Sequence, residues 1–176
     1  MTSDARVDRY YYIYDSRERR ALVLDRAGEE QTCEDSARAR LIDHVHERQS
    51  PTLLRHFARW CARQVDANEC PSHTAAGRLW AAAQRDDTSV WQRVRRETTD
   101  TVMLAVALGL SRGQPDAARL LVVHACTHPG AKEAALDAAH MSERWAEFSA
   151  ESDPVAAARA LRGRHIDWFL DRLSTP

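Results

Sequence analysis

Residues 53–65 read LLRHFARWCARQV, a run in which apolar side chains recur three and four positions apart. Such spacing places them on one face of an amphipathic α-helix. The members of this first stripe are Leu53, Phe57, Trp60, Cys61 and Val65. From Pro51 to Pro176 the chain contains six alanine-rich runs of this kind, each closed by Gly, Pro, Asp or Ser. The sequence therefore predicts an all-α fold, either an antiparallel helical bundle or a short solenoid-like stack of six to seven helices.

Residues that break or cap helices set the expected boundaries. Ser50-Pro51 and Asp153-Pro154 place a cap residue before a proline, which is typical of a helix start. The helices expected from such signals cover residues 33–48, 51–67, 73–85, 90–110, 116–126, 131–149 and 154–173. Leu120 to Val123 are apolar on every side, so we expect the helix over 116–126 to lie at the centre of the fold.

The first thirty residues differ from the rest, and we treat 1–30 as an appendage to a helical domain over 31–176. Tyr10 to Tyr14 and Ala21 to Leu24 are two β-prone runs with a polar turn between them, which favours a small β-hairpin. An amphipathic helix with Val7, Tyr10, Tyr11 and Tyr14 on one face is the alternative. In the hairpin, the strand edge carrying Tyr10, Tyr12 and Tyr14 could pair two copies of the chain into a homodimer.

Charge and composition exclude several classes of protein. The 176 residues include 25 basic and 26 acidic ones, a net charge of −1, which argues against a nucleic-acid partner. The N-terminus lacks a signal peptide, and Val102 to Leu110 is far too short to span a bilayer. The four cysteines form no CxxC pair and are expected as reduced thiols. We expect a cytoplasmic protein without a cofactor.

Arg119 and His124 are the one candidate for catalysis. Their spacing, with four residues between, resembles the Arg-x4-6-His motif of the HEPN ribonucleases, which are also helical. In that chemistry an arginine holds phosphate while a histidine moves protons. Four pairs in this chain satisfy the motif, about as many as its arginine and histidine content produces by accident. A HEPN-like ribonuclease, or an inactive relative, is therefore the alternative function.

His124, Cys126 and His128 have the alternating spacing of a metal-binding strand. On a helix the two histidines share a face and Cys126 points away, so the three cannot converge on one ion. We expect no metal site.

Trp91, Arg93, Arg95 and Arg96 form the densest basic cluster, and it stands beside an aromatic residue. An arginine–aromatic patch can bind RNA or an acidic protein surface, and a solvated helix face is the simpler interpretation. We retain it as a candidate binding patch.

Two stretches carry a resemblance to a known family. LLRHFARWCARQV at 53–65 and AARLLVVHACTHPGAKEAALDAAHMSERW at 117–145 resemble an alanine-rich all-helical bacterial family that includes predicted immunity proteins of polymorphic toxin systems. The likeness runs from Leu53 to about Leu173 and assigns no functional residues. It implies a protein that is not an enzyme and that binds another protein.

The sequence thus favours a non-catalytic protein–protein interaction module, immunity-like or an adaptor. No convergent set of polar residues is visible in the pattern, and a stack of helices presents surface more readily than it forms a pocket. The expected partner is another protein of unknown identity, with neither nucleic acid nor membrane involved.

Overall fold

The computed structural model of the chain describes residues 30–173, and their side chains from residue 37 onward. This part contains eight α-helices and no strand: α3 (Glu30–Glu47), α4 (Pro51–Gln64), α5 (Ala75–Ala83), α6 (Thr88–Glu97), α7 (Thr99–Leu104), α8 (Pro115–Cys126), α9 (Ala131–Ser149) and α10 (Pro154–Leu173). The all-α class is confirmed. The expected hairpin, with Tyr10, Tyr12 and Tyr14, lies outside the described residues.

Helix starts follow the cap residues for the most part. The Asp87 carboxylate accepts hydrogen bonds from the amides of Ser89 and Val90 at the start of α6, and Asp153 caps α10 by accepting from Ala156 N at 2.9 Å. Ser50 occupies the cap position of α4, but its side chain makes no capping bond. Ser50 contributes its backbone carbonyl, which accepts from Leu54 N at 3.3 Å, and it precedes Pro51, which is preorganised for the first turn.

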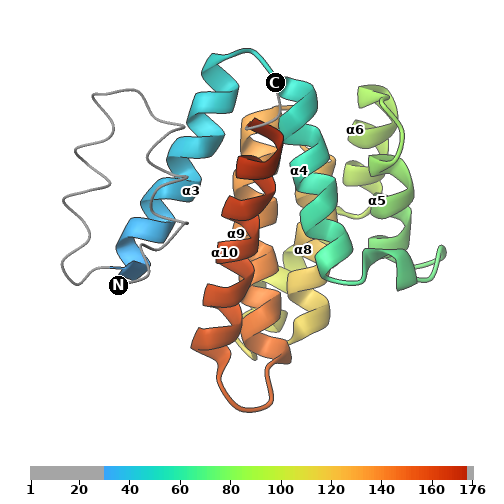
Figure 1. Cartoon of the computed structure of the whole chain (residues 1–176). Helices are drawn as coiled ribbons and strands as arrows, with labels where there is room; N and C mark the ends of the chain where they lie inside the picture. Colours follow the sequence, from blue (N-terminus) through green and yellow to red (C-terminus); the bar gives the residue numbers. More distant parts are fainter. Residues whose placement is uncertain (1–29, 174–176) are drawn as a thin grey trace, which may run out of the picture.

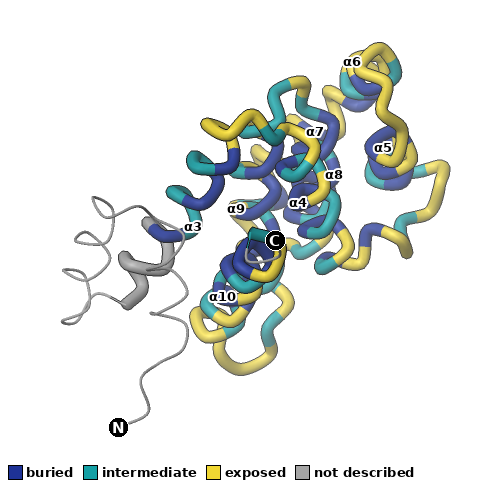
Figure 2. Tube along the Cα trace, turned by 45° about the horizontal axis from the view of Figure 1, so that its top comes forward, coloured by how far each residue is buried: buried dark blue, intermediate teal, exposed yellow. Residues whose placement is uncertain are grey.

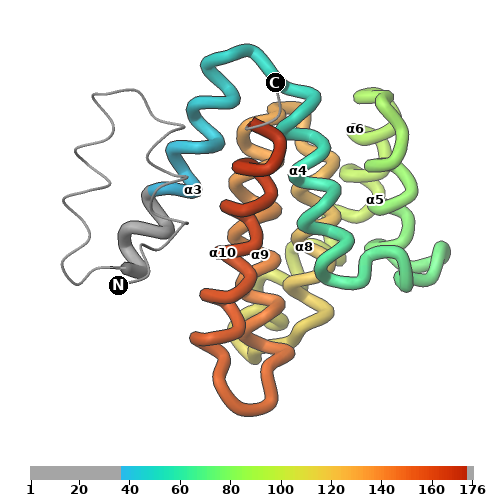
Figure 3. Tube along the Cα trace, in the orientation of Figure 1, coloured from blue at the N-terminus to red at the C-terminus, as the bar shows by residue number. Residues whose placement is uncertain are grey.

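Helix α9 lies at the centre of the molecule. It packs against α3, α4, α8 and α10, and Figure 1 shows α10 in front of it with α3 and α4 on either side. Its buried face is built from alanines that are fully inaccessible: Ala134, Ala135, Ala138 and Ala139. Short side chains allow the neighbouring backbones to approach closely, so α9 acts as a narrow seam between larger helices. A loop at the bottom of the view joins α9 to α10, and the two run antiparallel (Figure 3).

Helix α8 is the other inner helix, as its apolar sequence predicts. Leu120, Leu121, Val122 and Val123 are all buried, because α8 packs against α9, α4 and α5 and is covered by the segment before it. Large aromatic rings fill the space between α4 and α10, where Phe57 lies 4.4 Å from Phe169 between ring centroids. In Figure 2 burial is concentrated in these inner helices, whereas α6 at the edge is largely exposed.

The prediction of a single helix over 90–110 is wrong. The chain instead forms α6, α7 and a π-helical turn, η3 (Ala105–Gly109). At the first break Thr98 donates its hydroxyl to Val94 O at 2.8 Å and Thr99 to Arg95 O at 2.9 Å. Threonine hydroxyls that bond back to the previous turn bend a helix, and this is the physical reason for the bend between α6 and α7.

The π turn brings Gly109 against α8. A Cβ atom added to Gly109 would lie 2.3 Å from the Cβ of Ala117, closer than real Cβ atoms approach. Glycine is therefore required here by the close approach of two backbones. This contact fixes the position of η3, and with it the side chains that η3 exposes.

We predict that Gly109→Ala lowers the free energy of unfolding by about 1–3 kcal/mol, the usual range for overpacking. Adding Ala117→Gly returns the missing space, so the double variant should lose less than the sum of the two single losses. Urea unfolding of the wild type and the three variants measures this coupling. Strictly additive losses would show that the two residues do not compete for the same space.

Candidate functional site

Arg119 lies across the end of α4. Its Nε donates to the carbonyl oxygen of Val65 at 2.8 Å, and its NH1 is 3.3 Å from the carboxylate of Asp116. Val65 is the residue that closes α4, and its carbonyl has no partner within the helix. The arginine thus satisfies a helix end.

His124 contacts a different element. Its carbonyl oxygen accepts from Arg95 NH1 at 2.7 Å, and its imidazole has its pKa lowered to about 4 by burial and by the charges of Arg95 and His128. The ring is therefore neutral at pH 7. No described contact joins His124 to Arg119: the Arg119 side chain bonds to Val65 and Asp116, whereas Arg95 bonds to the backbone of His124. The structure does not bring this pair together.

Other arginines repeat the role of Arg119. Arg59 donates through Nε to Ala83 O, the last residue of α5, at 2.7 Å. Arg95 donates through NH1 to His124 O in the last turn of α8, a carbonyl that also accepts from Thr127 N and Oγ1. Arg55 donates to the carbonyl oxygens of His128 and Pro129 in the turn that follows. Carbonyl oxygens at a helix end lack donors and carry the negative end of the helix dipole. Several of the basic residues are therefore engaged in holding helix ends.

Trp91 does not belong to a surface patch. Its side chain is 5% exposed, and its indole N–H donates to Ala82 O at 2.9 Å and to Arg85 O at 2.8 Å. The cation that lies over its ring, 4.6 Å from the centroid, is Arg55 of α4. Trp91 therefore does not contribute to the candidate patch, because Trp91 and Val94 form the buried stripe of α6.

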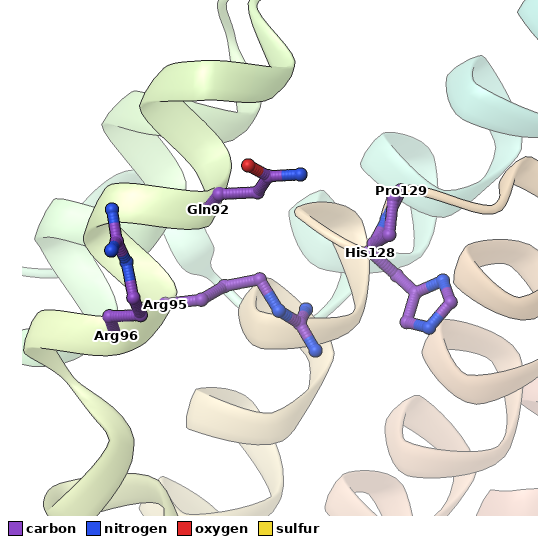
Figure 4. A pocket seen from close by; sticks show the side chains of 5 residues that line it. All are labelled: Gln92, Arg95, Arg96, His128 and Pro129. Carbon is purple, nitrogen blue, oxygen red and sulfur yellow. The ribbon is translucent and has the colours of Figure 1, made fainter.

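The arginines of α6 line a groove. Gln92 and Arg95 extend toward the turn between α8 and α9, which contributes His128 and Pro129, whereas the Arg96 side chain runs along α6 at the edge of the groove (Figure 4). The space between them is about 520 Å³ and open to solvent. Arg95 is half-buried and Arg96 is exposed, whereas Arg93 is exposed and is not among the residues that line the groove. We call this feature the cationic groove.

Farther along the same segment, α7 and η3 expose four large apolar side chains. Met103 is 61% exposed, Leu104 58%, Val106 46% and Leu108 44%. We call these four residues the apolar surface. Buried on the opposite side of the segment are Val102 and Gly109. The sequence could have indicated this surface, because the run from Val102 to Leu110 is apolar on all sides. When only one face of such a run is covered, the apolar side chains of the other face remain exposed.

A cluster that the sequence reasoning missed lies between α3, α9 and α10. Ser142 Oγ is 3.2 Å from His165 Nε2, and His165 Nδ1 is 3.4 Å from a carboxylate oxygen of Glu143. A serine, a histidine and a carboxylate in this order are the groups of a hydrolytic triad. The burial of Ser142 and Glu143 could have been predicted from the sequence, because they follow Ala138 and Ala139 at helical spacing and continue the buried stripe of α9.

The surroundings of this cluster are those of a core. Ser142 and His165 are fully buried, the Ser142 hydroxyl donates to Ala139 O at 2.8 Å, and Glu143 is paired with Arg162 at 2.9 Å and with Arg38. A nucleophile must be reached by its substrate, and this serine is not. The cluster ties three helices together by compensating one buried carboxylate.

Cys61 and Cys126 also lack the features of reactive thiols. Burial raises the pKa of Cys61 well above its ordinary value and that of Cys126 to about 12, so both remain protonated at neutral pH. Cys126 points back into the core and donates to Ala58 O at 3.2 Å. Within residues 37–173 no three His, Cys, Asp or Glu side chains gather as a metal site would require. None of the described helices is both long and apolar enough to cross a bilayer.

Comparisons with known proteins add no identification. No protein family, characterised protein or solved structure matches the chain.

The lowered pKa of His124 predicts a dependence of stability on pH. In the folded protein this imidazole takes up a proton only near pH 4, whereas in the unfolded chain it does so near pH 6.5. Between these values the unfolded chain binds the extra proton, so the free energy of unfolding falls as pH is lowered through the window.

The wild type loses stability when the pH is lowered from 7 to 5, and we expect this loss to be about 1 kcal/mol smaller in His124→Asn. The value allows for the partial exposure of the ring. Urea unfolding of both proteins at the two pH values measures the difference. Burial also lowers the pKa of His165. That residue is present in the wild type and in the variant, so its contribution to the pH dependence is common to both proteins. An identical pH dependence of wild type and variant would contradict the prediction.

Proposed function

We propose that this protein is a non-catalytic interaction module and that its protein partner binds the apolar surface of α7 and η3. The observation that carries the proposal is the exposure of Met103, Leu104, Val106 and Leu108 in one short segment. Single exposed apolar residues are ordinary on any protein, whereas several gathered together are typical of a site that another molecule covers.

Burying this surface would be favourable. Each apolar side chain removed from water contributes about 25 cal/mol per Å², and four large ones on adjacent turns can form the centre of an interface. Gly109 holds the segment close to α8, so the side chains are presented from a fixed backbone. Little ordering is then required on binding, which favours affinity.

The polar groups support a non-catalytic role. Arg119 is engaged at the end of α4, and Ser142 and His165 are out of reach of a substrate. The alanine-rich helices that resemble predicted immunity proteins fit the same function, since such proteins act by binding another protein. An adaptor would use the surface in the same way.

Site-specific photo-crosslinking in cells of the natural source tests this proposal. A photoreactive amino acid at Met103 or Leu108 should give discrete protein adducts, and Leu104→Asp should abolish them by placing a charge in the interface. Val155 is the matched control, because it is also 61% exposed but stands alone on α10. Equal labelling from position 155, or no adduct from 103 and 108, would contradict the proposal.

A further inference from the structure

We infer that the cationic groove binds an acidic segment of the same protein partner, so that the partner carries Asp or Glu side chains close to apolar ones. This inference rests on the proposed function and specifies the chemistry of the partner. Three properties of the groove support it: its position relative to the apolar surface, the state of its arginines, and its limited extent.

The groove and the apolar surface lie on consecutive parts of one segment, formed by α6, α7 and η3. Gln92 and Arg96 are exposed on α6, and Met103 and Val106 are exposed beyond the bend. Arg96 and Met103 are seven residues apart in the chain, on either side of the break at Thr98. Because the two features are this close along the chain, one segment of a partner can contact both.

Arg95 is held in place before any ligand arrives. Its NH1 donates to His124 O at 2.7 Å and to Thr127 Oγ1 at 3.3 Å, and burial lowers the pKa of its guanidinium without bringing it near neutral pH. Asp137 is the acidic group that acts on it most. Arg96 adds a second cation at the rim. A carboxylate entering the groove would therefore meet the preorganised Arg95, with the positive charge of Arg96 at the edge.

The extent of the charge favours a protein over a nucleic acid. A nucleic-acid site needs a long positive track along the phosphate backbone, whereas this groove offers about 520 Å³ and two arginines. Immediately beyond them Glu97 is exposed and ion-paired with Arg78, and Asp100 is exposed, so the positive charge does not continue along the segment. A partner segment with a short acidic stretch followed by apolar residues fits this order, because its carboxylates would lie in the groove and its apolar side chains on the apolar surface.

The test selects peptides from a random phage-displayed 12-residue library on the full chain and then measures their affinity for two variants. Arg96→Glu reverses a charge in the groove. Arg93→Glu makes the same change on the same helix, outside the groove, and serves as the matched control. We expect the selected peptides to be enriched in Asp and Glu beside apolar residues. Arg96→Glu should weaken them roughly tenfold and Arg93→Glu should leave them unchanged.

A peptide with Lys in place of its acidic residues should regain affinity for the Arg96→Glu variant, which separates recognition of charge from damage to the fold. Peptides without acidic residues, or equal losses in both variants, would overturn the inference while leaving the proposed function intact. Failure to select any peptide sensitive to Leu104→Asp would overturn both. Competition by single-stranded RNA that Arg96→Glu abolishes would overturn the inference by assigning the groove to nucleic acid.

Discussion

Helix ends are the groups that this fold must satisfy from outside, because the last four carbonyl oxygens of a helix have no donor within it. Arg119, Arg59 and Arg95 supply donors to the ends of α4, α5 and α8. Each of these arginines comes from a different helix than the one it caps, so every bond also fixes how two helices pack. The positive charge lies at the negative end of the helix dipole, which adds to the stabilisation. The alanine seam of α9 joins the middles of the helices, and the arginines join their ends.

This arrangement explains why a chain rich in arginine need not bind nucleic acid. A guanidinium that donates to a helix-end carbonyl has fewer N–H groups left for a phosphate and is held away from a continuous surface track. The arginine of the HEPN-like pair is one of the capping residues, and its histidine lies beside another, Arg95. Among the groove residues, Arg96 is exposed and lies at the rim, next to the segment that presents the apolar surface.

Most helices could be predicted from the sequence, because apolar spacing and cap residues are local signals. The central position of α8 followed from Leu120 to Val123, which leave no polar face. The break at Thr98 was not predicted, since the same threonine is compatible with a straight helix until its hydroxyl bonds to Val94 O. The groove and the Ser142–His165–Glu143 cluster depend on contacts between distant helices. Spacing within one helix does not encode such contacts.

The claim that the arginines divide into capping and surface residues is tested most directly by one set of unfolding measurements. Methionine substitution of Arg59, Arg95 and Arg119 should lower the free energy of unfolding by about 1–3 kcal/mol each, because a helix-end carbonyl loses its charged donor. The same substitution at the exposed Arg93, Arg96 and Arg112 should change it by no more than about 0.5 kcal/mol. Overlapping losses in the two sets would show that the arginines do not hold the helix ends.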